Sequence, residues 1–128
     1  MSYLVACLEP QKDGWSNIIS LVSSRVFDNI YLLTDTDRDK SFIANIPESV
    51  KVSIIIVNLN QPVEDLTEEI IKMLRNAFGR DKMMDLDIAI NISSGNGKEH
   101  AALISAIMKL GYGLRFVDID KDGDVIAL

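Results

Sequence analysis

The chain has 128 residues, of which 48% are hydrophobic and 25% are charged, a composition typical of a folded globular protein. Its formal net charge of −6 argues against the broad basic surface that gives proteins nonspecific affinity for nucleic acid. We therefore expect no direct nucleic-acid binding by this segment. The length predicts one domain, residues 1–128.

The single cysteine, Cys7, lies in the apolar run YLVACL and is expected to be a core residue. One cysteine excludes an intrachain disulfide and a cysteine-based metal site, which fits a reducing cytoplasm. The N-terminus lacks a basic signal region, and no apolar run approaches the length of a membrane span. We expect a cytoplasmic protein without a membrane partner.

Apolar runs alternate along the chain with segments of helical periodicity. The expected strands are residues 3–8, 30–33, 52–59, 86–92, 114–119 and 125–128. One helix is expected after Asp13 as N-cap, with an apolar stripe that reaches Val26. Further helices are expected over 63–78, with Gly79 as terminator, and from 96 or 97 to 110, with Gly111 as terminator. Residues 41–49 are ambiguous, and a short helix is one interpretation.

This order predicts an α/β protein with a Rossmann-like three-layer sandwich. It would contain a mainly parallel sheet, helices on both faces and a C-terminal β-hairpin at the turn DKDGD. Ligands of such sheets bind beyond the carboxyl ends of the strands. The relevant loops are EPQKDGWS, TDTDRDK, NLNQP and SSGNGK.

The stretch SSGNGK, between the fourth strand and the next helix, is the main candidate site. A helix that starts at Asn96 or Gly97 would offer free N–H groups to an anion, Ser93 and Ser94 would add hydroxyls, and Lys98 would add charge. The same residues also suit a plain β–α turn, which uses glycine for positive φ and serine or asparagine for capping. The sequence leaves both interpretations open.

Several other residues are candidates with an equally ordinary alternative. Gln11 and Lys12 would reach a ligand held between the first and fourth crossover loops, or they are plain surface residues. His100 would contact a bound phosphate from the first turn of its helix, or it is an ordinary surface histidine. Asp35 and Asp37 are expected to be solvated loop charges or caps.

Familiar catalytic and metal motifs are absent. SSGNGK is not a Walker A motif because Ile92 and Glu99 stand where glycine and Ser/Thr belong, and the first loop lacks GxGxxG. DIDKDGD resembles the start of a calcium loop, but its twelfth position would fall after Leu128, so we prefer a hairpin turn. We expect no metal, no cofactor and no catalytic triad. The five methionines are expected to pack in the core.

The order of elements, together with NISSGNGKEHAALISAIMKLGYGLRFV, resembles the CARF family, the CRISPR-associated Rossmann-fold sensor domains. The likeness is closest to stand-alone or regulator-type sensors. In that family the fourth strand ends in Asn/Asp-x-Ser/Thr-x-Gly-Thr-Lys/Arg, to which Asn91, Ser93, Gly95 and Lys98 correspond. The opening VACLEPQKDGWSNIISLVSSRVFDNIYLLTD also resembles the family's first β-α-β unit.

The chain departs from the family pattern in two ways. Two residues, Asn96 and Gly97, follow the motif glycine where the family has one, which would rotate Lys98 by about 100° around a helix that has already begun. Similar proteins also continue into a winged-helix or nuclease domain, whereas this sequence ends at Leu128. The resemblance therefore leaves three interpretations open: a ring-cleaving enzyme, a decoy that sequesters the ligand, or a sensor separated from an effector or winged-helix domain that is not present in this chain.

The resemblance implies a homodimer whose two strand-end clefts form one site for a cyclic oligoadenylate, a second messenger of antiviral defence. A metal-independent ring nuclease is the alternative, with Ser93, Ser94 and Lys98 as catalytic candidates that would act by positioning and charge stabilisation. A third hypothesis is a dimerisation domain of a transcription regulator that binds no ligand. The implied ligand-binding residues are Gln11, Lys12, Asn91, Ser93, Ser94, Gly95, Asn96, Gly97 and Lys98.

Overall fold

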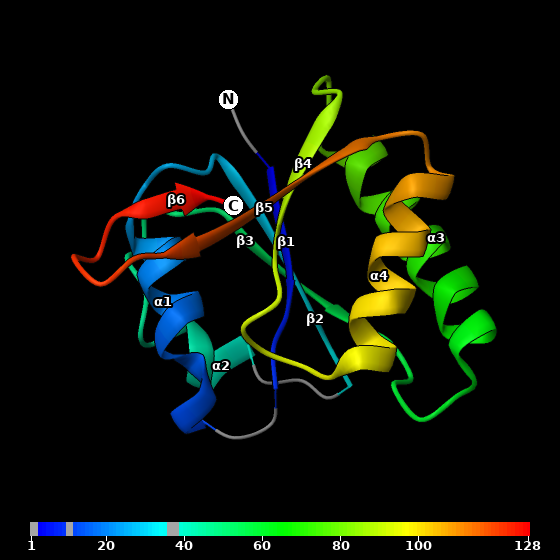
Figure 1. Cartoon of the computed structure of the whole chain (residues 1–128), viewed down its shortest axis with the longest axis horizontal. Coiled ribbons are helices and arrows are strands. Elements are labelled where there is room, and N and C mark those ends of the chain that lie inside the picture. Colours follow the sequence, from blue (N-terminus) through cyan, green and yellow to red (C-terminus); the bar gives the residue numbers. More distant parts are fainter. Residues whose placement is uncertain (1–2, 10–11, 36–38) are drawn as a thin grey trace.

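A computed structural model describes residues 3–9, 12–35 and 39–128, with the backbone alone for residues 12–13 and 39–40 (Figure 1). Its six-stranded sheet has the order β3-β2-β1-β4-β5-β6, in which β1 to β5 pair in parallel and β6 pairs antiparallel with β5. The predicted α/β sheet with a closing hairpin is confirmed. The elements are β1 (Tyr3–Cys7), η1 (Lys12–Trp15), α1 (Ser16–Ser23), β2 (Asn29–Thr34), α2 (Asp39–Ile43), β3 (Val52–Ile56), α3 (Val63–Arg80), β4 (Asp87–Asn91), α4 (Gly97–Lys109), β5 (Gly113–Ile119) and β6 (Val125–Ala127).

The central strand β1 is buried along its whole length because helices cover both faces of the sheet. Its side chains alternate between two cores: Tyr3, Val5 and Cys7 belong to one, and Leu4 and Ala6 to the other. The first core is completed by α3 and α4, and the second by α1 and α2, on the opposite side of the sheet (Figure 1). The continuous apolar run of β1 is thus explained by its position in the middle layer.

The sheet has a topological switch point between β1 and β4. From β1 the chain proceeds to β2 and then β3 on one side, whereas β4 lies on the other side of β1 and is followed by β5. Crossovers diverge at such a point, and ligands of open α/β sheets bind beyond the strand ends there. The loop after β1 and the loop between β4 and α4 meet at this edge, at the bottom of the view in Figure 1.

The first helix differs from its sequence prediction. A 3₁₀ turn, η1, precedes α1, so Asp13 lies within that turn, and Trp15 takes the position before the helix. The helix ends at Ser23, and Arg25 follows in the left-handed region with φ 63°. Val26, expected on the buried stripe, is therefore outside the helix and 53% exposed.

The helix α3 also ends differently from its prediction. Gly79, expected as terminator, is helical, and α3 continues to Arg80. The left-handed residue is Lys82, with φ 53°, and the N–H groups of Lys82 and Met83 donate to the carbonyls of Gly79 and Phe78. This is a Schellman ending in which lysine occupies the position usually held by glycine.

Smaller differences concern strand ends and methionines. The strand β3 ends at Ile56, three residues before the expected end at 59. Met73 and Met83 pack against the core as expected, but Met84 and Met108 are 84% and 61% exposed, so for these two the prediction was wrong. Among the described residues, no helix combines the length and the apolar character needed to cross a membrane.

Candidate ligand site at the carboxyl ends of β1 and β4

Asn91 ends β4 and anchors the loop that follows. The side chain is buried, and its amide donates to the carbonyl of Val117 at 2.9 Å and to Oδ1 of Asp118 at 3.3 Å, both on β5. Its Oδ1 accepts from the N–H of Ser93 at 3.0 Å and from the Ser93 hydroxyl. One side chain must donate and accept here, which an amide can do and a carboxylate cannot. Asn91 therefore sets the direction in which the loop leaves the sheet.

The two serines of the loop point in opposite directions. Ser93 is exposed, and its hydroxyl donates to Asn91, which leaves the oxygen lone pairs open to solvent. Ser94 is fully buried, and its hydroxyl oxygen accepts from the N–H of Glu9 at 2.9 Å. Ser94 thus joins the loop after β1 to the loop after β4, while Ser93 faces solvent.

His100 holds the same loop from the first turn of α4. Its Nε2 lies 2.8 Å from the carbonyl oxygen of Ser94. A carbonyl can only accept a hydrogen bond, so this contact places the proton of a neutral ring on Nε2. The histidine is half-buried and ties the helix to the loop. It is therefore not an ordinary surface histidine, and the ring nitrogen Nε2 is bonded to the loop and not directed at a phosphate.

Gly95 allows the loop to pass close to β1. Its φ is +97°, and an added Cβ would lie 3.0 Å from Cβ of Cys7 and 2.8 Å from Oε1 of Glu99. Both the left-handed backbone and the missing side chain are needed at this position. The tight strand-to-helix turn therefore forms without a clash against the end of β1.

The start of α4 leaves two backbone donors open. Asn96 and Glu99 form a capping box, in which Asn96 Oδ1 accepts from the Glu99 N–H at 3.0 Å and the Asn96 N–H donates to Glu99 Oε1 at 3.3 Å. Within the described part of the chain, the N–H groups of Gly97 and Lys98 have no acceptor. They are the unpaired donors of a 13-residue helix, where the helix dipole also favours an anion.

The Lys98 side chain lies across the site toward α3. Its Nζ donates to the carbonyl oxygen of Gln61, just before α3, at 3.0 Å, and the side chain is exposed. An incoming phosphate would compete with one solvent-exposed carbonyl. The ammonium of Lys98 can leave this carbonyl at little cost, because a water molecule can donate to the carbonyl in its place.

The described part of the first loop contributes to the site through the backbone of Glu9. The Glu9 N–H binds Ser94, and the Glu9 carbonyl accepts from the Trp15 indole at 2.8 Å. Gln11 lies outside the described residues, and Lys12 begins η1 without a described side chain. Asp37 also lies outside the described residues. Asp35 lines an open cavity of about 460 Å³ beside the ends of β2 and β3.

Sequence reasoning missed Glu9 and Asp118. Asp118 Oδ1 accepts from Asn91, from the N–H of Ile119 at 2.8 Å and from Asn17 at 3.4 Å, so it fixes Asn91 from the neighbouring strand. No local pattern marks either residue, because each acts on a partner distant in the sequence. The turn after β5 was predicted to be a hairpin turn, and it does connect the antiparallel strands β5 and β6.

The chemistry of these groups suits binding and positioning. Burial, together with the charge of Glu99, raises the pKa of the Cys7 thiol to about 12, so the thiol stays protonated at neutral pH and is a poor nucleophile. Within residues 3–9, 12–35 and 39–128, no hydroxyl of the site is hydrogen-bonded to a general base. No cluster of His, Cys, Asp or Glu suited to a metal ion occurs among those residues either.

No protein-family model matches the chain, and no curated protein sequence matches it. Solved structures do match. Csm6 of Enterococcus italicus, bound to cyclic hexa-2′-fluoro-hexa-dAMP, aligns with a TM-score of 0.62 at 12% identity over 94% of this chain. Can2 from Sulfobacillus thermosulfidooxidans, in complex with cyclic tetra-adenylate, aligns with a TM-score of 0.61 at 12% identity over 98%. A type III CRISPR defence DNA nuclease activated by cyclic oligoadenylate aligns with a TM-score of 0.55 at 15% identity over 96%.

These are CARF-domain proteins, and the chain has their fold. The fold implied by the sequence resemblance is therefore confirmed. The alignments include nearly all of this chain but only 34%, 36% and 20% of those three chains, in the same order. This chain thus corresponds to one part of each larger protein.

Proposed function

We propose that this chain is a CRISPR-associated sensor domain that binds a cyclic oligoadenylate, or a related nucleotide, at the strand-end site of a homodimer. The start of α4 carries the proposal, because the N–H groups of Gly97 and Lys98, at the switch point of the sheet, have no acceptor among the described residues. A phosphate is the natural acceptor at such a helix start. The ligand class is supported by the similar structures, two of which hold a cyclic adenylate.

The nine candidate residues divide into two roles in this proposal. Gly97, Lys98 and Ser93 face the ligand, with backbone N–H groups, an ammonium and an exposed hydroxyl. Gln11 and Lys12 would approach from the first loop. The residues that shape the loop from within are Asn91, Ser94, Gly95 and Asn96.

The outer face of α4 supports the homodimer. Ala101, Ser105 and Met108 are exposed at spacings of four and three residues, so they form one stripe. Small residues allow two helices to approach closely. A second copy related by a two-fold axis along this stripe would bring two α4 starts to one ring, and a symmetric ligand suits a symmetric pair.

Binding is the primary role in this proposal, with residues 1–128 as one cytoplasmic domain that signals to an effector or winged-helix domain in antiviral defence. Among the described residues, the Ser93 hydroxyl is hydrogen-bonded to Asn91 and to no base, which favours binding over rapid chemistry. Slow ring cleavage by alignment of a ribose 2′-hydroxyl needs no such base. Ring cleavage is therefore the second activity to be measured, with Ser93, Ser94 and Lys98 as the residues to test.

The test is thermal unfolding with cyclic tri-, tetra- and hexa-adenylate, each compared with the linear oligoadenylate of equal length. A ring at about 100 times its Kd adds about 2.7 kcal/mol, which for a chain of this size raises the Tm by at least about 5 °C. Only a ring should produce this shift. Equal shifts with ring and linear forms would contradict recognition of the closed ligand.

Two further measurements separate the alternatives. Light scattering reports the oligomeric state, and incubation with the bound ring in EDTA followed by chromatography reports cleavage. A monomer, with and without ligand, would refute the shared site. A dimer without a shift for any ring would refute the sensor function and favour the ligand-free dimerisation domain, whereas linear products in EDTA would establish the metal-independent ring nuclease.

A further inference from the structure

A second cavity lies at the opposite end of α3 and α4 from the candidate site. Its volume is about 390 Å³, within the range of small-molecule pockets. Its nine lining residues come from the end of α3, the loop after it, the end of α4 and the turn before β5. They are Arg75, Phe78, Gly79, Lys82, Met83, Met84, Lys109, Leu110 and Tyr112. None of them belongs to the strand-end site.

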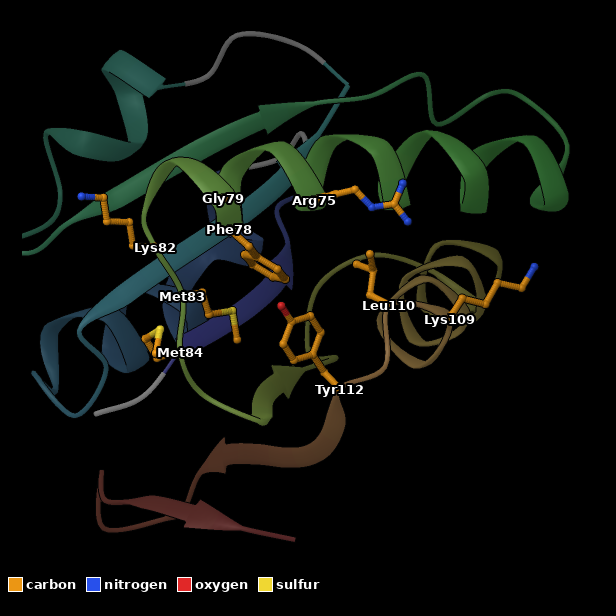
Figure 2. A pocket seen from close by; sticks show the side chains of 9 residues that line it. All are labelled: Arg75, Phe78, Gly79, Lys82, Met83, Met84, Lys109, Leu110 and Tyr112. Atoms are coloured by element: carbon orange, nitrogen blue, oxygen red, sulfur yellow. The ribbon is translucent and has the colours of Figure 1, made fainter.

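The floor of the cavity is apolar and aromatic. Figure 2 shows Phe78, Met83 and Tyr112 directed toward one another at its centre. The rings of Phe78 and Tyr112 meet edge to face, with centroids 5.5 Å apart. Phe78 is buried, whereas Tyr112 is half-buried and its hydroxyl has no hydrogen-bond partner among the described residues. The floor thus offers ring surface and one open hydroxyl.

The rim of the cavity is cationic, in a chain whose net charge is −6. Arg75, Lys82 and Lys109 are exposed, and no lining residue is acidic. In the described part of the chain, neither Arg75 nor Lys82 has an ion-pair partner, and Lys109 meets only the exposed Glu68 at 3.8 Å. Figure 2 shows Lys82 on one side of the floor and Arg75 and Lys109 on the other.

Gly79 keeps the wall of the cavity open. A helical glycine costs about 0.5–1 kcal/mol relative to alanine, yet an added Cβ here would meet nothing within 4 Å, and φ is not positive. Neither close packing nor backbone conformation requires glycine, since the left-handed ending is at Lys82. Gly79 lines the cavity, and the open space beside its backbone is left unfilled.

We propose that this cavity is a second binding site, for a small organic anion with an aromatic or aliphatic body. The body would lie on Phe78, Met83 and Tyr112, and its carboxylate, sulfonate or phosphate would meet the cations on one side of the rim, either Lys82 or the pair Arg75 and Lys109. Electrostatic complementarity selects an anion over a neutral molecule of the same shape. The site does not depend on the proposed sensor function, because the two sites share no residue.

The test uses two fluorescent probes with nearly the same aromatic body. One is 8-anilinonaphthalene-1-sulfonate, which is an anion, and the other is N-phenyl-1-naphthylamine, which is neutral. The folded wild-type protein should bind the anionic probe at least about fivefold more tightly, and added salt should reduce the difference. Chemical shifts of Gly79 and Tyr112 should move on binding. No binding, equal affinity for both probes, or shifts confined to other residues would overturn the proposal.

Matched variants then locate the probe. Gly79→Leu should fill the cavity and weaken anionic-probe binding at least about tenfold, while Gly79→Ala, which adds one methyl group, is the control for helix stability. The double change Arg75→Gln/Lys82→Gln should weaken it at least about fivefold, unlike Lys72→Gln/Lys121→Gln, which removes two exposed charges elsewhere. Equal effects of the two double changes would overturn the proposal, even if Gly79→Leu fails to fold.

Discussion

The change Gly97→Pro tests whether the backbone at the start of α4 binds the ligand. Gly97 is the first helical residue, where proline's fixed φ is tolerated and its missing N–H breaks no helix hydrogen bond. Asn96 before it is extended, with φ −124° and ψ 177°, as a residue before proline must be. The variant therefore removes one open donor and should keep the fold.

The expected effect on affinity follows from one lost hydrogen bond to a charged phosphate. Such a bond contributes about 1.5–3 kcal/mol, so the Kd should rise about 10- to 150-fold. In a homodimer each protomer loses one donor, so a rise in Kd of about 10-fold is the minimum expected. Calorimetric titration with the ring that binds the wild type measures the change, and thermal unfolding without ligand should show an unchanged or higher Tm.

The control is Gly97→Ala, which keeps the N–H and places its methyl group where nothing lies within 4 Å. It should bind nearly as well as the wild type. Equal affinity of the proline and alanine variants would show that this N–H does not contact the ligand. Our account of the helix start as a phosphate site would then be wrong.

Three further predictions concern stability and reactivity. Ser94→Ala should lower the free energy of unfolding by about 1–3 kcal/mol in urea titrations, because the Glu9 N–H loses its acceptor; exposed Ser93→Ala should cost less, and equal costs would contradict the assignment. Hydrogen bonds from Arg80, Tyr31 and Lys51 hold the pKa of Asp81 below its usual value, so its contribution is present above about pH 4 and lost as the pH falls below that value. Urea titrations should show a smaller loss between about pH 7 and pH 3 in Asp81→Asn than in the wild type, and an identical loss would refute this. Cys7 should react with a thiol reagent in denaturant and hardly at all in the native protein; fast native labelling would contradict its burial.

Local patterns were sufficient for the elements and for the edge of the sheet that carries the candidate site. The run YLVACL has no polar alternation, which predicted a strand covered on both faces, and β1 is that strand. The residues after Ile92 combine a cap, glycines and an amphipathic segment, so the start of α4 was predicted within one residue. Such signals lie within a few neighbouring residues, and the backbone responds to them directly.

Local patterns did not predict the ends of elements that are set by a partner distant in the sequence. Gly79 is a good helix terminator in isolation, but α3 continues to Arg80, and Asp81 then bonds with Tyr31 and Lys51 from the β2–β3 region. Those contacts place the end of the helix, and the left-handed residue falls on Lys82. The sequence alone does not reveal that the hydroxyl of Tyr31 donates a hydrogen bond to the carboxylate of Asp81.

The sequence by itself determined the order of the strands and of the three longer helices, the kind of sheet and the candidate loop, because periodicity and turn chemistry are local. Only the tertiary structure decided that Ser94 points inward and Ser93 outward, since the difference rests on the N–H of Glu9, 85 residues away. It also brought Lys98 to Gln61 and assembled the cavity between the ends of α3 and α4. These features are made of contacts that form when the chain folds, and no segment contains them alone.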